Sequence, residues 1–132
     1  MKKDIPVLKV EDLAIAIVPK EDDPAFWDVY VINLKDEAIK SVIITARAFG
    51  EIDGVARQSA MMRYFLEEMP PLDIQFLEHL PNDLTALTNE YWVSYSYDNH
   101  LWDKRLLILP GSFEPINFIP IPFIEREGIL KR

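Results

Sequence analysis

The sequence predicts an all-β protein, an antiparallel β-sandwich of seven or eight strands. Apolar residues recur mainly with a period of two, which is the pattern of strands with one buried face. Runs rich in β-branched and aromatic residues follow each other about every ten residues, with short polar connections between them. The chain has 132 residues, of which 49% are hydrophobic, so we expect a single domain over residues 1–132 with its own core.

The first two strands are expected at 7–10 and 13–18. Both runs are apolar, and Pro19 ends the second because proline lacks the N–H that a ladder needs. The acidic stretch 21–24 contains a proline as well, so we expect an exposed loop before the next strand.

The clearest strand is predicted at 27–34, and the chain returns through a second strand at 39–49. In the first, one face carries Trp27, Val29 and Val31, and the other carries Tyr30, Ile32 and Leu34. In the second, one side carries Val42, Ile44, Ala46 and Ala48. Because only a short polar connection separates the two runs, we expect them to pair as an antiparallel hairpin.

The segment 58–69 fits two structures. Met, Leu, Glu and Ala are good helix formers, and its apolar residues also suit a helical stripe. The surrounding strands favour an extended segment, and we expect a strand. The alternative is an α+β domain in which 58–69 forms one helix on a sheet.

Three further strands are expected at 72–79, 91–97 and 101–109, with a turn at Asp98-Asn99 between the last two. The final segment, 110–132, interleaves prolines with large apolar residues. Proline fixes φ and cannot donate to a ladder, so this segment should form an extended edge strand or a strap across the domain.

The run from Leu87 to Tyr95 resembles the late central strand of immunoglobulin and fibronectin type III domains. This resemblance implies an immunoglobulin-like sandwich, with Tyr91 at a sandwich corner and Val93 in the core. The whole chain is also similar to an uncharacterised family of small bacterial proteins with this layout. The resemblance implies no mechanism.

The charge and composition of the chain limit the classes of partner that we expect it to bind. The net charge is −8, which disfavours nucleic acid because binding to phosphate depends on Lys and Arg. The chain has no cysteine, so we expect neither disulfides nor thiolate metal sites, and we predict a reducing, cytoplasmic location. No apolar run reaches the ~20 residues that span a bilayer, so no membrane association is expected.

Catalytic motifs are missing from the sequence. It has neither a glycine-rich phosphate loop nor a serine nucleophile elbow, and we expect no cofactor and no metal. His100 and Asp103 are an imidazole and a carboxylate three residues apart, at the start of a predicted strand. With Tyr97 they define a weak candidate ligand site, although a solvated turn histidine beside a surface acid is the simpler interpretation.

Aromatic and apolar residues indicate an interaction surface instead. In 91–97 we place the tyrosines and Val93 in the core, which turns Trp92 outward as a rigid amphipathic anchor unless the C-terminal segment covers it. The C-terminal segment 110–132 has two possible positions. It covers this domain, which is favoured, or it pairs as an added strand with the sheet of a neighbouring subunit. The candidate interface residues are Trp92, Trp102, Ile116, Phe118, Ile121 and Phe123.

The sequence therefore predicts a non-catalytic protein-interaction or scaffolding module that binds an unidentified protein or forms a homodimer. The alternative is a small ligand-binding protein or enzyme with a cleft near His100 and Asp103.

Overall fold

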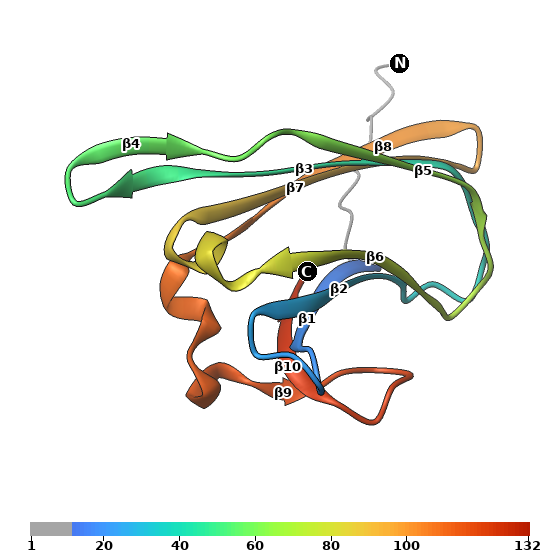
Figure 1. Cartoon of the computed structure of the whole chain (residues 1–132). Helices are drawn as coiled ribbons and strands as arrows, with labels where there is room; N and C mark the ends of the chain where they lie inside the picture. The colour runs from blue at the N-terminus through green and yellow to red at the C-terminus, as the bar shows by residue number, and fades with distance from the viewer. Residues whose placement is uncertain (1–11) are drawn as a thin grey trace, which may run out of the picture.

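Two antiparallel sheets packed face to face form the molecule, which confirms the predicted all-β sandwich (Figure 1). The computed structural model describes residues 12–132, so the strand predicted at 7–10 lies outside the described residues. We call the layers the β1 sheet and the β3 sheet. The described part contains ten strands rather than seven or eight, because two short strands, β4 and β9, add to the predicted set.

The β1 sheet has the strand order β6-β2-β1-β10-β9. Its members are β1 (Leu13–Pro19), β2 (Phe26–Asn33), β6 (Asp73–Pro81), β9 (Ile119–Pro120) and β10 (Glu127–Lys131). Strand β1 lies at its centre and is buried along almost all of its length. This burial agrees with its continuous run of small and β-branched residues.

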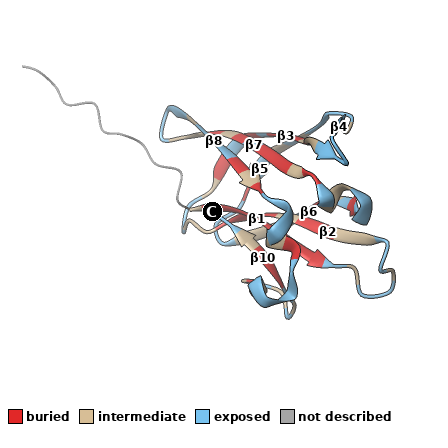
Figure 2. Cartoon of the chain, turned by 90° about the vertical axis from the view of Figure 1, so that its left-hand side faces the viewer, coloured by how far each residue is buried: buried red, intermediate tan, exposed pale blue. Residues whose placement is uncertain are grey.

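The β3 sheet has the order β4-β3-β7-β8, and β5 pairs with β3 as well. Its members are β3 (Ile39–Ile52), β4 (Val55–Gln58), β5 (Met62–Met69), β7 (Thr88–Tyr97) and β8 (His100–Ile108). Strand β3 is long enough to pair with β5 through its first half and with β4 through its second. The β3–β4 hairpin therefore projects beyond the sandwich, and β4 is exposed throughout (Figures 1 and 2).

Strand β5 settles the ambiguous segment. Residues 62–69 are extended and pair with β3, so the strand interpretation is confirmed and the helical alternative is wrong. Tyr64 and Leu66 pack against the core while Phe65 is exposed, which is the period-two pattern of a sheet. Pairing with β3 overrides the helix propensity of the Met, Leu and Glu residues.

The hairpin predicted between 27–34 and 39–49 is wrong, because β2 and β3 lie in different sheets. Strand β2 pairs with β1 and β6. The connection after it crosses the sandwich, and the Asn33 side-chain amide holds it by donating to the carbonyl oxygens of Glu37 and Pro70 at 3.0 and 2.9 Å. A five-residue connection spans the ~10 Å between packed sheets as readily as it closes a hairpin.

The core lies between the sheets, as the buried segments in Figure 2 show. The inward faces of β2, β3 and β7 are those that the sequence predicts, whereas β6 buries Leu77 and Leu80 in the core instead of Ile74 and Phe76. Val29 and Val31 of β2 are fully buried, as are Val42 and Ile44 of β3. In β7, Val93 is buried between Tyr91 and Tyr95, with Trp92 on the opposite face.

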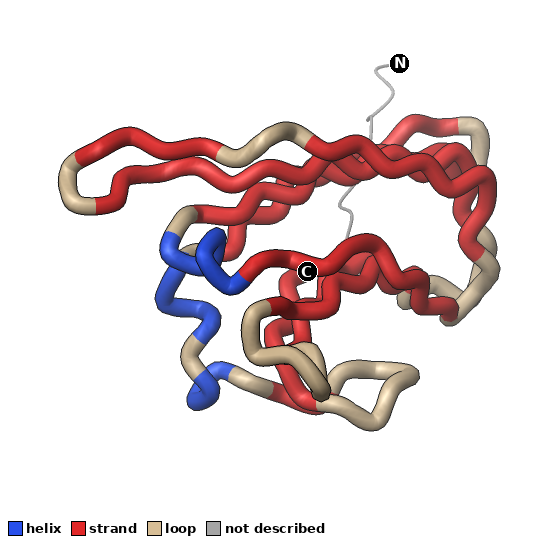
Figure 3. The backbone as a smooth tube through the Cα atoms, viewed as in Figure 1, coloured by secondary structure: helices blue, strands red, loops and turns tan. Residues whose placement is uncertain are grey.

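The C-terminal segment changes conformation along its length (Figure 3). Two 3-10 turns, η2 (Pro110–Phe113) and η3 (Pro115–Asn117), lead from β8 round one end of the sandwich. Only β9 and β10 of this segment pair as strands. Strand β10 pairs with β1 and β9 on its two sides, so the sheet edge predicted for this segment belongs to the two-residue β9.

Residues after β9 cover the outer face of the β1 sheet. Ile121 is 3% exposed and belongs to a second apolar cluster that is separate from the main core. The other buried members of this cluster are Ala14, Ala16, Val18 and Ile32. We call residues 121–126, between β9 and β10, the covering loop. Arg126 fixes this loop by donating to the Pro19 carbonyl at 2.7 Å and to the Asp28 carboxylate at 3.0 Å. The tail therefore covers its own domain, as favoured.

Candidate functional site

The outer face of the β3 sheet, which we call the open face, carries exposed apolar side chains. Ile43, Phe65 and Trp92 are 38%, 61% and 48% exposed. Phe65 of β5 lies directly opposite Ile43 of β3, and Trp92 of β7 is opposite Thr45, diagonal to Ile43. Cross-strand and diagonal neighbours on one face lie within contact reach of large side chains. We call these three residues the apolar patch.

Trp92 occupies the outward position predicted for it. The proposed cover by the C-terminal segment does not form, because Ile121 and Ile124 of that segment pack on the outer face of the β1 sheet and Phe118 packs on the main core. The indole Nε1 donates to the Asp103 carboxylate of β8 at 3.4 Å. A tryptophan with one apolar edge free and its N–H partnered is the kind of anchor found at protein interfaces.

A charged cluster lies beside the patch. Glu90 of β7 is only 4% exposed, although it faces outward, because two arginines cover it. Arg47 Nε donates to Glu90 Oε1 at 2.8 Å, and Arg105 Nε donates to Oε2. The hydrogen bond from Arg47, with the bond and charge of Arg105, lowers the pKa of Glu90 despite its burial. The cluster keeps the carboxylate ionised and holds both guanidinium groups at fixed positions.

Strand β5 is an edge strand. In the described part of the chain it pairs only with β3, so its other side presents unpaired backbone groups. Its open-face residues are Arg63, Phe65 and Glu67, which alternate with the inward Tyr64 and Leu66. These residues were not among the predicted interface residues, because the segment also fitted a helix. The sequence signal was an aromatic residue with a positive charge two residues before it and a negative charge two residues after it.

The other predicted interface residues divide into two groups. Trp102 stacks on Tyr95 with ring centroids 6.4 Å apart, and Phe118 contacts Trp27 edge-on at 6.0 Å, so both pack with the core. Ile121, in the covering loop, is buried against the β1 sheet. Ile116 and Phe123 are exposed, at 92% and 51%, at the turns of the C-terminal segment and apart from the open face.

The weak ligand-site residues are not assembled. His100 Nδ1 lies 2.6 Å from the Asp98 carbonyl, whereas Asp103 contacts Trp92. The two residues are three apart on β8, so strand alternation directs them to opposite faces. Tyr97 donates to Glu37 at 2.7 Å, and this hydrogen bond raises the pKa of Tyr97 to about 12.

Tyr91 differs from what the resemblance to immunoglobulin domains implies. Val93 is in the core, as the resemblance implies. Tyr91, however, is 1% exposed and its hydroxyl donates to Glu78 of the opposite sheet at 2.8 Å. A sandwich-corner tyrosine instead bonds to the backbone a few residues upstream.

Comparisons of the chain with protein-family models, with curated proteins and with solved structures find no match. The likeness to immunoglobulin domains and to a family of small bacterial proteins therefore stays a prediction. Over residues 12–132, no group of three or more His, Asp or Glu side chains is arranged to hold a metal ion. The same residues contain no helix long and apolar enough to cross a membrane.

Proposed function

We propose that the protein is an interaction module that forms a homodimer by antiparallel pairing of β5 with β5 of a second copy. The observation that carries the proposal is the residue pattern of this edge strand. Around Phe65, Arg63 lies two residues before and Glu67 two residues after. An antiparallel pair centred on Phe65 therefore sets Arg63 of each copy opposite Glu67 of the other.

Such an interface satisfies the symmetry of a two-fold dimer, in which the same patch is used by both copies. The central pair is Phe65 with its equivalent, and on the inner face Tyr64 lies opposite Leu66. Opposite charges and aromatic pairs across strands each contribute roughly 0.2–1 kcal/mol. New backbone hydrogen bonds along the eight residues of β5 add to these terms.

The apolar patch supports the same arrangement. Pairing at β5 would join the two β3 sheets and bring two copies of Phe65 together at the junction, each beside its own Ile43. Large aromatic side chains exposed on an edge strand favour self-association unless charges oppose it. Here the charges attract in the antiparallel register.

The test is the oligomeric state in solution, measured by light scattering after size exclusion. At roughly 100 μM, a concentration at which a micromolar dimer is populated, we expect a dimer. Glu67→Arg should convert it to a monomer, because Arg63 then faces a like charge. Combining Arg63→Glu with Glu67→Arg should restore the dimer, since each pair is again opposite in sign.

Glu51→Arg is the matched control, because Glu51 is exposed on the same sheet but lies outside β5. It should leave the dimer unchanged. A wild-type monomer at this concentration contradicts the proposal, and so does a dimer that Glu67→Arg leaves intact. Rescue by the charge-swapped double variant is the outcome that a general loss of folding cannot imitate.

A role for His100, Asp103 and Tyr97 in a ligand cleft has less support than the β5 interface. Each of the three has its own separate hydrogen-bond partner. A shared site needs side chains that converge on one space, and these do not.

A further inference from the structure

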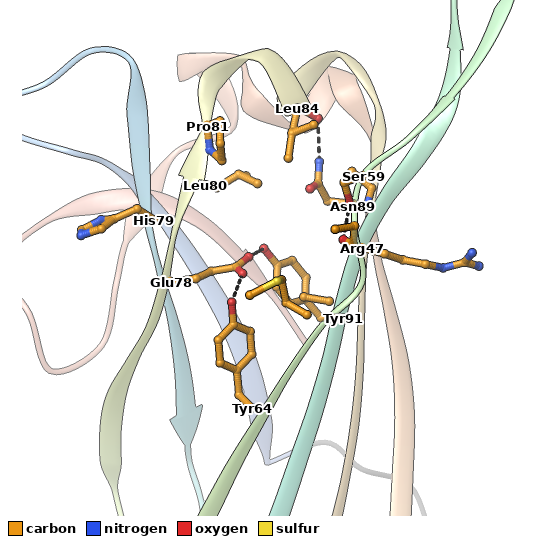
Figure 4. A pocket seen from close by; sticks show the side chains of 14 residues that line it. Arg47, Ser59, Tyr64, Glu78, His79, Leu80, Pro81, Leu84, Asn89 and Tyr91 are labelled. Atoms are coloured by element: carbon orange, nitrogen blue, oxygen red, sulfur yellow. Dashed lines mark hydrogen bonds between the residues drawn. The ribbon is translucent and has the colours of Figure 1, made fainter.

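A pocket of about 320 Å³ opens between the two sheets at one end of the sandwich. Its wall comes from β3, β5 and β7 on one side and from β6 with the following 3-10 turn, η1 (Asn82–Ala86), on the other (Figure 4). Most of this wall is apolar. The apolar residues include Ala46, Ala48, Met62, Leu80 and Leu84.

A carboxylate enters this apolar space because β6 has a bulge. Val29 pairs with Glu78 and Tyr30 pairs with Phe76, which leaves Leu77 as the extra residue. A bulge of one residue reverses the alternation beyond it, so Glu78 shares the inward face with Leu77. Regular alternation from buried Leu77 would direct Glu78 to the outer face.

Two tyrosines hold Glu78 in place. Tyr64 of β5 donates to Oε1, and Tyr91 of β7 donates to Oε2 at 2.8 Å (Figure 4). Burial, together with the neighbouring carboxylate, raises the pKa of both tyrosines. Both hydroxyl groups therefore stay protonated and act as donors over the physiological range. The carboxylate is thus fixed by donors from two strands of the opposite sheet.

Among the described residues, no cationic side chain lies beside the Glu78 carboxylate. In the described part of the chain, the ion pairs do not include Glu78. Two nitrogen-bearing side chains of the pocket wall point away from Glu78: Arg47 donates to Glu90, and His79 Nδ1 lies 2.8 Å from the Asp28 carboxylate (Figure 4). A carboxylate has about four acceptor positions. The tyrosines fill two and leave two for another donor.

We propose that this pocket binds a primary ammonium group on a short apolar stem. The ammonium would donate to the free acceptor positions of Glu78, and the stem would lie against Ala46, Leu80 and Leu84. An ammonium group has three hydrogen-bond donors, and its positive charge would pair with the carboxylate of Glu78. The volume lies at the lower end of the range for small-ligand pockets. This inference does not depend on dimer formation at β5.

The probe is n-butylammonium, titrated into the protein and followed by the amide resonances of the pocket residues. We expect these resonances to shift at millimolar probe, whereas n-butanol, the neutral molecule of similar shape, leaves them unchanged. Glu78→Gln should weaken binding at least about tenfold, since it removes the charge and keeps the shape. Glu37→Gln is the matched control, because Glu37 also accepts from a tyrosine but on the exposed surface.

Equal binding of butanol, or equal binding by Glu78→Gln, would overturn the proposal, as would a wild-type spectrum that the probe does not change. If Glu78→Gln fails to fold, Leu84→Trp replaces it. That variant keeps the carboxylate and fills the pocket, so it should abolish the shifts. A lysine peptide with blocked ends distinguishes the source: tighter binding than butylammonium indicates a protein side chain, and equal binding indicates a free amine.

Discussion

The outer faces of the two sheets differ, although their inner faces share one core. On the β1 sheet, Ala14 and Ala16 leave a shallow surface that Ile121 and the rest of the covering loop fill. On the β3 sheet, Phe65 and Trp92 project into solvent. Small residues make room for a segment of the same chain, whereas large ones present area to another molecule.

This contrast assigns the two surfaces different roles. The covered face is held by apolar contact and by Arg126, so it belongs to the stability of the domain. The open face has its fixed Arg47–Glu90–Arg105 cluster and the free edge of β5, so it is where we place the interaction surface. Variants on the two faces should therefore affect folding and association separately.

The largest effect on stability should follow from Gly128→Ala, which breaks the covered side. A Cβ at Gly128 would lie 2.7 Å from Val18 Cγ1 and closer still to the Ile17 carbonyl oxygen. Strand β10 must then move away from β1, and we expect a loss of about 4 kcal/mol in the free energy of unfolding. Urea denaturation measures it. Gly111→Ala is the control, since a Cβ there meets nothing within 4 Å, and its stability should stay near wild type.

Ile121→Ala tests how much the cover contributes. Ile121 is 3% exposed, and truncating a buried isoleucine costs about 3 kcal/mol, as transfer and cavity terms add. Ile116→Ala, in the same segment, removes a side chain that is 92% exposed and should cost less than about 0.5 kcal/mol. The thermal unfolding midpoints of the two variants compare them directly. Equal losses would contradict the assignment of the covered face.

Glu90→Gln sharpens the contrast through pH. The pKa of Glu90 is lowered from its usual 4.5, so the ionised cluster stabilises the fold at neutral pH and loses this contribution as pH falls below that value. At pH 7 the variant should lose about 2 kcal/mol, the size of a hydrogen bond to a charged group. The difference from wild type should shrink by pH 3. A difference that does not change with pH would argue against an ionised cluster.

Trp92→Ala should have the smallest effect on stability. The indole is 48% exposed and its one hydrogen bond is to a surface carboxylate, so we expect a loss of about 1 kcal/mol or less. Chemical denaturation measures this loss. If the variant unfolds instead, Trp92 belongs to the core and the open face is not a free surface.

Local pattern was enough to predict most of the strands. Strands predicted at 13–18, 91–97 and 101–109 correspond to β1, β7 and β8 within a few residues. The outward position of Trp92 followed from alternation once the face with Tyr91 and Val93 was assigned to the core. The candidate interface was therefore partly predictable.

Pairing between distant strands was not predictable in the same way. The sequence predicted that 27–34 pairs with 39–49. In the structure the connection between them crosses the sandwich instead, held by the side-chain amide of Asn33. Glu78 was missed for a related reason. A bulge at Leu77 reverses which side of β6 faces inward, and no feature of the local sequence marks where an extra residue will be left unpaired.

The sequence by itself determined the all-β class, the limits of most strands and the buried faces of β2, β3 and β7, since alternation is a property of neighbouring residues. Only the tertiary structure decided which strands pair, that the tail covers the β1 sheet and that Glu78 enters the pocket. Those outcomes depend on contacts between residues far apart in the chain, where packing of whole faces outweighs local preference.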